Sequence, residues 1–237
     1  MLIQRPESEA KIAAMFDRVA PKYDFLNRLL SARQDQRWRK RLASMIPFRP
    51  NGRYLDCATG TGDVLLTVAG VHPEYGELVG TDISGEMLAL AKSKVAASGL
   101  KQPVQLQLMS AESLDLPDSK FDSVSISFGL RNVVKRDQAL REFHRVLVPG
   151  GVLLILEFFI PKRGLMAALF QFYFHTILPF IGGIFSDREA YKYLPQSVGS
   201  FYSPDELRQA LYETGFNVEG GESYLFGACR LVRAVKR

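Results

Sequence analysis

The sequence predicts an α/β fold in which a mostly parallel, seven-stranded sheet carries helices on both faces. From Arg53 onward, short apolar runs alternate with amphipathic stretches, and strand–helix repetition of this kind is typical of parallel sheets with right-handed crossovers. Of the 237 residues, 47% are apolar and 23% are charged, with no low-complexity tract and no internal repeat. This composition excludes intrinsic disorder of the bulk, a fibre and a large multidomain assembly.

A helical segment precedes the alternation. Apolar residues recur at helical spacing from Ile12 to Val19 and again from Phe25 to Met45, and Pro21 is expected to break the run between them. We therefore expect a helical cap at residues 1–50 and a main domain at residues 51–237, with an insertion at residues 160–202.

The elements of the main domain follow from apolar runs and their flanking turns. Ser203, Pro204 and Glu206 supply an N-cap, a first-turn proline and first-turn acidity for the last helix. The predicted strands are residues 54–57, 77–82, 104–109, 121–128, 151–158, 216–223 and 229–236, and the predicted helices are residues 63–70, 85–97, 136–147 and 204–214.

Positive charge is concentrated in the N-terminal segment. Residues 1–50 hold 11 Lys and Arg against 5 Asp and Glu, whereas the rest of the chain holds 19 against 20. The densest stretch runs from Arg33 to Arg41 and includes Asp35 and Trp38. Such a patch attracts nucleic acid, an anionic membrane or an acidic substrate, and it is equally compatible with a solvated helix face.

Cysteine and histidine are too sparse to suggest a disulfide framework or a structural metal. The 2 cysteines, Cys57 and Cys229, lie far apart, and the 3 histidines show no ligand spacing. We expect a reducing compartment and no metal. The first residues contain no charged leader followed by an apolar run, so no signal peptide is expected.

The strongest local motif is a glycine turn after the first predicted strand. Gly60, Thr61 and Gly62 connect that strand to a helix, and such a turn lets a ligand approach the backbone and the free N–H groups of the helix. The third glycine of the dinucleotide fingerprint would fall at Leu65 and is absent, which argues against NAD. A tight structural turn remains the alternative.

A carboxylate ends the second predicted strand. Asp82 lies 22 residues after Gly60, where an acidic side chain can accept hydrogen bonds from both ribose hydroxyls. The ligand is therefore expected to be a nucleoside derivative. The alternative is that Asp82 only caps the helix at residues 85–97.

Two further segments follow strands at the same edge of the sheet. Ser110 and Ala111 come after the third strand and are candidates to border an adenine, or else form a polar turn. Ser127, Arg131 and Asn132 follow the fourth strand. Ligands of doubly wound sheets bind outside the carboxyl ends of the strands, so these residues are favourably placed.

These motifs together resemble class I S-adenosylmethionine-dependent methyltransferases over residues 53–158. A closer resemblance, to the UbiE/MenG family of quinone-biosynthesis C-methyltransferases, covers nearly the whole chain. The segments that carry it are Met15–Asp24, Trp38–Arg39, Ser127–Val133, Arg145–Glu157 and Tyr191–Leu194, and the Phe-Gly-Leu-Arg-Asn run within Ser127–Val133 is the most specific.

The family resemblance implies a cofactor, a reaction and a set of site residues. S-adenosylmethionine would lie with its methionine at Thr61, its ribose at Asp82, its adenine beside Ser110 and Ala111, and Ser127 at the floor. The methyl group would go to a ring carbon of a polyprenylated quinol, in menaquinone or ubiquinone biosynthesis. Apart from the resemblance, the need to deprotonate a quinol hydroxyl makes Tyr23 and Arg131 our candidates to orient and polarise that hydroxyl, with Asp24 and His175 behind them. The alternatives are that Tyr23 packs within the helical cap and that Arg131 is a surface cation.

Four positions depart from the family pattern. Leu26 replaces methionine, Asp35 stands where a histidine is expected, Val148 replaces lysine and Phe159 replaces serine. Leucine conserves apolar volume, but the missing histidine removes a proton carrier. The departures bear on substrate detail more than on the reaction.

Two other functions fit parts of the sequence. One is methylation of a phenol oxygen or an amine, which the same cofactor site would serve. The other is a nucleic-acid-binding module that uses Arg33–Arg41, although we expect no nucleic-acid partner. Oligomeric state is left open, a homo-oligomer included.

A long apolar segment lies before the last helix. Gly164–Phe185 contains no Asp, Glu, Lys or Arg over 22 positions, but Gln171, His175 and Pro179 argue against a membrane span. We expect it to roof the site, shelter a prenyl chain and contact an anionic membrane surface from the cytoplasmic side. A buried core helix is the alternative.

Overall fold

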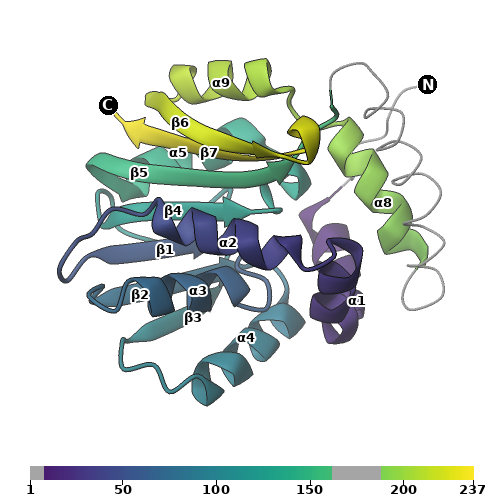
Figure 1. Ribbon diagram of the computed structural model, residues 1–237, viewed down its shortest axis with the longest axis horizontal. Coiled ribbons are helices and arrows are strands. Elements are labelled where there is room, and N and C mark those ends of the chain that lie inside the picture. Colours follow the sequence, from purple (N-terminus) through teal and green to yellow (C-terminus); the bar gives the residue numbers. More distant parts are fainter. Residues whose placement is uncertain (1–7, 162–187) are drawn as a thin grey trace.

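The computed structural model describes residues 8–161 and 188–237 (Figure 1). Its sheet has seven strands in the order β3-β2-β1-β4-β5-β7-β6. The strands are β1 (Arg53–Cys57), β2 (Glu77–Asp82), β3 (Val104–Leu108), β4 (Phe121–Ser127), β5 (Leu147–Phe158), β6 (Phe216–Tyr224) and β7 (Cys229–Lys236). The helices are α1 (Glu9–Leu30), α2 (Gln34–Ser44), α3 (Asp63–Val71), α4 (Gly85–Ala97), α5 (Arg136–Val146), α8 (Arg188–Gly199) and α9 (Pro204–Glu213), with short 3₁₀ turns η1 (Leu130–Asn132) and η3 (Leu225–Gly227).

The predicted topology is confirmed. Strands β1 to β5 run parallel, and β7 pairs antiparallel with both β5 and β6. Helices α2 and α3 cover one face of the sheet and α5 the other (Figure 1). The N-terminus of α9 is also as predicted, because Ser203 and Glu206 form a reciprocal capping box with Pro204 in the first turn.

Two sequence predictions about boundaries are wrong. Pro21 does not break the N-terminal helix, since α1 continues through it from Glu9 to Leu30. Burial of Val19, Ala20 and Leu26 on either side stabilises the helix despite the hydrogen bond that proline cannot make.

The start of β5 was also predicted too late, at residue 151. The strand begins at Leu147, which pairs with Phe121, and its register then shifts before Val152 pairs with Ser123. The Val148–Gly151 segment is thus an irregularity inside the strand, with Gly150 at a left-handed φ of 73°. The helix before it ends at Val146.

The hydrophobic core lies on both faces of the sheet. On one face, Leu55, Val124 and Ile155 pack with α5 and α9 residues such as Phe143 and Leu211. The other face has a cluster in which α2 and α3 residues pack on the strands, with members Trp38, Leu42, Leu65, Tyr54 and Leu154. Helix α2 therefore shares its core with the sheet, and the division of the chain at residue 50 stays a prediction.

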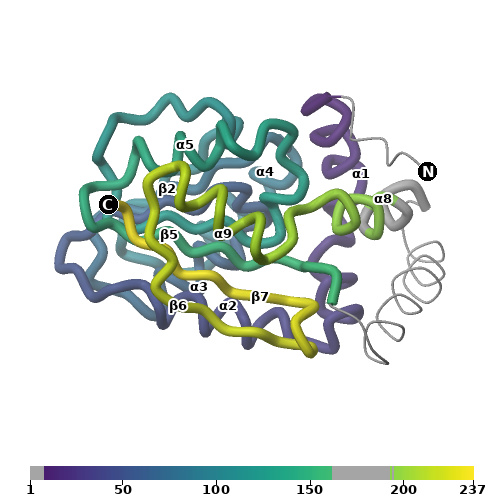
Figure 2. The backbone as a smooth tube through the Cα atoms, turned by 90° about the horizontal axis from the view of Figure 1, so that it is seen from above, coloured from purple at the N-terminus to yellow at the C-terminus, as the bar shows by residue number. Residues whose placement is uncertain are grey.

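Helices α1 and α8 lie at the end of the sheet toward which β4 and β5 point (Figure 1). The view from above places them there side by side as well (Figure 2). Helix α1 contacts α4 and α8, and α8 contacts η1. The carboxyl ends of the parallel strands are therefore covered by α1.

Among residues 8–161 and 188–237, no helix is long and apolar enough to cross a membrane. The predicted roof, Gly164–Phe185, lies outside the described residues.

Candidate active site

A cavity lies between α1 and the carboxyl ends of β1, β2, β3 and β4. Each of these strands contributes residues from the turn that follows it, and α1 and α4 contribute apolar side chains. The lining residues are Glu9, Ile12, Phe16, Tyr23, Ala58, Gly60, Asp82, Ile83, Met87, Met109, Ala111, Glu112, Ser127, Phe128, Gly129, Asn132, Val133 and Val134.

The glycine turn after β1 requires left-handed backbone. Ala58, Gly60 and Gly62 have φ angles of 51°, 58° and 81°. A Cβ at Gly60 would meet no atom within 4 Å, so this position faces open space beside the cavity. Below the turn, the buried Asp56 carboxylate accepts hydrogen bonds from Thr59 Oγ1 at 2.7 Å and from Ser125 Oγ at 2.6 Å. The turn is thus held from beneath while its upper surface stays accessible to a ligand.

Asp82 joins the second strand to the glycine turn. Its Oδ2 accepts the N–H of Gly60 at 2.8 Å, and its Oδ1 accepts the N–H of Ser84 at 2.9 Å. Burial raises the pKa of Asp82, while the backbone donors oppose that rise. Ser84 is the N-cap of α4, because its hydroxyl accepts the N–H of Met87. Asp82 is therefore fixed at the cavity wall and is not the helix cap.

Two polar atoms at the cavity wall have no hydrogen-bond partner within the described part of the chain. They are Ser127 Oγ at the end of β4 and Asn132 Oδ1 in η1, and both are buried. Between them, Phe128 has a left-handed φ of 54°, and a Cβ at Gly129 would lie 2.6 Å from Ala58 Cβ. The turns after β1 and β4 thus approach closely, and buried polar atoms of this kind usually have a partner.

The segment after β3 is held by hydrogen bonds within the loop and to α5. Ser110 Oγ accepts the N–H of Glu112, and Glu112 Oε1 accepts the N–H groups of Val134 and Lys135 at 3.0 and 2.9 Å. Ala111 and Glu112 line the cavity, whereas Ser110 lies just behind them.

An ionic network connects α1 to the glycine turn. Thr61 Oγ1 donates to Asp24 Oδ1 at 2.6 Å, and Lys94 Nζ lies 2.5 Å from both Asp24 Oδ2 and Asp63 Oδ1. Arg39 continues it from α2, 2.5 Å from Asp63 Oδ2. Sequence reasoning missed Lys94 and Asp63, because charged residues on separate helices give no local pattern.

Tyr23 lines the cavity from α1. Burial raises the pKa of its hydroxyl, while a hydrogen bond with Asn27 and the nearby charges of Arg131 and Arg39 lower it in part. The phenol therefore stays protonated at neutral pH, and its O–H is able to donate a hydrogen bond.

Arg131 is buried behind the cavity wall. Its Nη1 lies 2.5 Å from Glu157 Oε1 and donates to Phe128 O at 2.7 Å, and its backbone N–H reaches Glu157 Oε2 at 3.2 Å. Glu157 is fully buried on β5. The pair fixes the turn after β4 and places a positive charge within electrostatic range of Tyr23.

The structure brings five of the nine sequence-predicted site residues to the cavity wall. These are Tyr23, Gly60, Asp82, Ala111 and Ser127. The other four, Thr61, Gly62, Ser110 and Arg131, lie behind the wall and hold lining residues or their neighbours in place. His175 lies outside the described residues.

The departures from the family pattern have structural roles. Asp35 is buried, accepts Ser31 Oγ at 2.6 Å and lies 3.2 Å from Arg39, so it belongs to the ionic network rather than to the cavity. Leu26 is fully buried, and Phe159 packs on Phe201.

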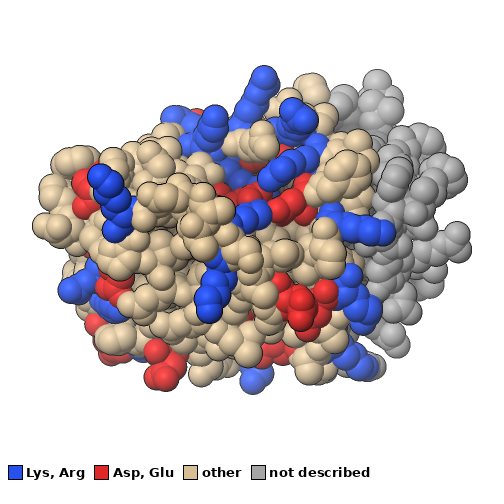
Figure 3. Space-filling model, turned by 90° about the horizontal axis from the view of Figure 1, so that it is seen from below, with Lys and Arg blue, Asp and Glu red and all other residues tan. Residues whose placement is uncertain are grey.

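Basic and acidic side chains lie close together on the surface. Figure 3 shows Lys and Arg side chains gathered along the upper edge of the face seen from below, on the side of α2 and α3, with carboxylates beneath them. Within the predicted basic patch, Arg39 is buried in ion pairs and Arg41 pairs with Glu222 at 2.6 Å. Arg33, Arg37 and Lys40 are exposed.

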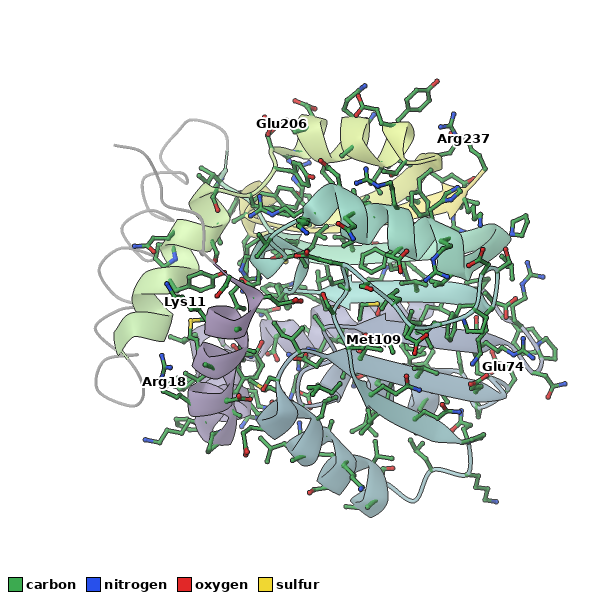
Figure 4. All side chains as sticks on the ribbon, turned by 180° about the vertical axis from the view of Figure 1, so that it is seen from behind. Lys11, Arg18, Glu74, Met109, Glu206 and Arg237 are labelled. Carbon is green, nitrogen blue, oxygen red and sulfur yellow. The ribbon has the colours of Figure 1, made fainter. Side chains whose placement is uncertain are left out.

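One side of α1 carries basic side chains, and another side lines the cavity. Figure 4 shows Lys11 and Arg18 leaving α1 on the side where α8 lies, while Glu74 and Arg237 mark the opposite end of the sheet. Ile12, Phe16 and Tyr23 line the cavity instead. Across the described ranges, no cluster of three or more His, Cys, Asp or Glu is placed to hold a metal ion.

A seven-stranded sheet with β7 antiparallel between β5 and β6, a glycine turn after β1 and a carboxylate ending β2 define a class I methyltransferase. Residues 5–236 match the model of the ubiE/COQ5 methyltransferase family. The chain belongs to this family, which confirms the sequence prediction of the family and of a methyltransferase.

Curated relatives cover most of the chain. A protein of Geotalea daltonii named ubiquinone/menaquinone biosynthesis C-methyltransferase UbiE is 49% identical over 89% of this chain and 89% of its own length. A demethylmenaquinone methyltransferase of Thermus thermophilus is 43% identical over 86% of this chain and 92% of its own.

Solved structures share the fold at lower identity. The [4+2]-cyclase SpnF matches with a TM-score of 0.72 and 19% identity, covering 98% of this chain and 97% of its own. A SAM-dependent methyltransferase from Aquifex aeolicus matches with a TM-score of 0.61 and 21% identity, covering 84% and 89%. These likenesses confirm the predicted fold.

Proposed function

We propose that this protein transfers the methyl group of S-adenosylmethionine to a ring carbon of a polyprenylated quinol, in menaquinone or ubiquinone biosynthesis. Family membership supports the reaction, and the names of the relatives support the substrate class. The observation that carries the proposal is the cavity at the strand ends, where a glycine turn, a fixed carboxylate and two unpartnered polar atoms meet beneath an apolar helix.

The cofactor is proposed to lie along the ends of β1, β2 and β3. Gly60, Thr61 and Gly62 would flank its methionine. Asp82 would accept hydrogen bonds from its ribose hydroxyls, using the carboxylate lone pairs that are not already bonded to the N–H groups of Gly60 and Ser84. The residues present fit the cofactor, because the space above Gly60 is open and Ser127 Oγ lacks a partner. Ser110 and Ala111 would border the adenine.

The quinol ring is proposed to lie between the cofactor and α1. Ile12 and Phe16 supply an apolar wall there, which also excludes water from the reacting atoms. S-adenosylmethionine, when bound, supplies an electrophilic methyl group that needs an in-line approach of the ring carbon. Orientation of the ring by the cavity wall would therefore account for much of the rate.

The quinol becomes nucleophilic at carbon when its neighbouring hydroxyl gives its proton to solvent. After the methyl group is added, the same ring carbon would release its own proton to solvent, and S-adenosylhomocysteine would be the other product. Tyr23, whose pKa is raised by burial, would donate a hydrogen bond to the developing oxyanion. Arg131, held by Glu157, would stabilise the same charge over a longer range. These roles make both residues more important for turnover than for cofactor affinity.

Peripheral contact with the anionic inner face of the cell membrane is part of this proposal. A polyprenylated substrate resides in the bilayer, and the exposed cations of α2 favour an anionic surface. Self-association into a homo-oligomer is compatible with the same chemistry and is tested by sedimentation.

The test is methyl transfer from labelled S-adenosylmethionine to a panel of reduced and oxidised quinone precursors, together with phenols and amines. We expect label on a ring carbon of the reduced precursors alone, located by carbon-13 NMR of the product. Label on oxygen or nitrogen acceptors, with none on any quinol, would overturn the proposal.

A further inference from the structure

Two large apolar side chains stand in solvent at the tip of the β6–β7 hairpin. Leu225 is 49% exposed and Phe226 is 77% exposed, the latter being the most exposed large apolar side chain among the described residues. Isolated exposed apolar residues are common on protein surfaces, so exposure alone does not indicate a function.

The backbone of the tip is strained where these side chains lie. Leu225 and Phe226 have left-handed φ angles of 48° and 54°, followed by Gly227 at 96°. A left-handed conformation is costly for bulky residues and is normally left to glycine, asparagine or aspartate. Polar residues would relieve both the strain and the exposure, so the choice of leucine and phenylalanine points to a contact.

The position of the tip relates it to the cavity. Tyr224 and Phe158 both pair with Cys229, so the hairpin turns just beyond the carboxyl end of β5. The cavity also lies at the carboxyl ends of the strands. A partner that contacts Leu225 and Phe226 would therefore lie at the same end of the sheet as the cavity.

Basic residues flank the tip. Trp38 of α2 stacks on Tyr224 with ring centroids 5.8 Å apart, and Arg41 binds Glu222 of β6 at 2.6 Å. Arg37 and Arg41 lie four residues apart on one side of α2, and Arg33 is the N-cap residue that precedes the helix. We call these three residues the arginine stripe of α2. All three are exposed, which places cations beside the apolar tip.

We propose that Leu225 and Phe226, flanked by the arginine stripe of α2, form the docking surface for an anionic lipid bilayer. The tip inserts its two side chains among the acyl chains, and Arg33 and Arg37 bind lipid phosphates, while Arg41 stays paired with Glu222. Docking turns the site end of the sheet toward the membrane that holds a prenylated quinol. This orientation rests on the proposed function, whereas vesicle binding itself needs no substrate.

The first experiment is vesicle co-sedimentation with the full chain. Vesicles of phosphatidylcholine alone are compared with vesicles in which about one third of the lipid is phosphatidylglycerol. We expect binding to the anionic vesicles, and at least about tenfold weaker binding of the double variant Leu225→Asn/Phe226→Asn. Asparagine tolerates left-handed backbone, so the variant should fold with an unchanged or higher Tm.

A matched control replaces an exposed phenylalanine at the other end of the sheet. Phe48 is 71% exposed and lies shortly before the start of β1. Phe48→Asn should bind anionic vesicles as the wild type does. The variant Arg33→Gln/Arg37→Gln should lose the preference for anionic over neutral vesicles.

Turnover separates this inference from the proposed function. The tip variant should methylate a short-chain, water-soluble quinol at the wild-type rate and lose rate only with a long-chain quinol in vesicles. Wild-type binding by the tip variant overturns the docking surface, as does a changed oligomeric state without a change in vesicle binding. If no quinol is methylated by any form, the proposed function fails while the vesicle result still decides the docking surface.

Discussion

The two walls of the cavity are built in different ways. The wall formed by the strand ends consists of backbone turns fixed by hydrogen bonds, as with Asp82, whose carboxylate accepts the N–H groups of Gly60 and Ser84. The opposite wall is a single helix, α1, which presents Ile12, Phe16 and Tyr23 and is tied to the glycine turn through Asp24. In the proposed function, the hydrogen-bonded strand-end wall binds the cofactor and α1 contacts the acceptor.

The largest effect is expected at Gly60. Gly60→Val would project a branched side chain into the open space above the turn and would force a β-branched residue to a φ of 58°. Cofactor binding should be undetectable by calorimetry. A folded Gly60→Val variant with wild-type affinity would remove the turn from the site, and circular dichroism verifies folding.

The carboxylate beneath the turn should make stability depend on pH. Burial raises the pKa of Asp56 from 3.8 to about 6. The folded state therefore holds this proton more tightly than the unfolded chain, so the stabilisation is complete below about pH 4 and is lost as pH rises through about 6.

This dependence is measured by urea unfolding of the wild type and Asp56→Asn from pH 4 to pH 8. Relative to the variant, the wild-type free energy of unfolding should fall by up to about 3 kcal/mol across that window. If the free energy of unfolding depends on pH in the same way for both proteins, the raised pKa of Asp56 is contradicted.

Asp82→Ala should weaken cofactor binding by about 2 kcal/mol, because the ribose loses a charged acceptor and Gly60 loses its anchor. Asp82→Asn retains a carbonyl acceptor and should lose less. Calorimetric titration with S-adenosylhomocysteine measures both variants. Equal affinity in wild type and Asp82→Ala would exclude the ribose assignment.

The smallest effect tests the connection between the two walls. Lys94→Met leaves Asp24 and Asp63 without their shared cation and should cost about 1 kcal/mol of stability, since the group is partly exposed. It should also raise the KM for the quinol, because Asp24 belongs to α1. Lys92→Met, an exposed change on the same helix, is the control and should alter neither value. If Lys94→Met and Lys92→Met have the same stability and the same KM, the ion pairs of Lys94 do not influence α1.

Local sequence patterns predicted the sheet and the strand-end wall of the cavity. The glycine turn, Asp82 and the strands around them are each read from a few adjacent residues, and all were found within a residue or so of their expected positions, except the start of β5. That strand begins earlier because pairing of Leu147 with Phe121 continues the sheet through a segment rich in proline and glycine.

Long-range contacts explain what the sequence could not predict. Pro21 was taken as a helix break, but tertiary burial of its neighbours keeps α1 continuous. Lys94, Glu157 and Asp63 act through partners 26 or more residues away, so no local spacing marks them. Arg131 was expected to face the acceptor, whereas its guanidinium binds Glu157 behind the wall.

The most direct test compares, in the same assays, one residue proposed to bind the cofactor with one proposed to act on the acceptor. Asp82→Ala and Arg131→Lys are measured for cofactor Kd by calorimetry and for kcat with a short-chain quinol. The account predicts that Asp82→Ala raises Kd by about thirtyfold, while Arg131→Lys leaves Kd nearly unchanged and lowers kcat about a hundredfold, because lysine keeps the charge but not the guanidinium geometry. A raised Kd in Arg131→Lys with normal kcat, together with an unchanged Kd in Asp82→Ala, would contradict the assignment of Asp82 to the cofactor and of Arg131 to turnover.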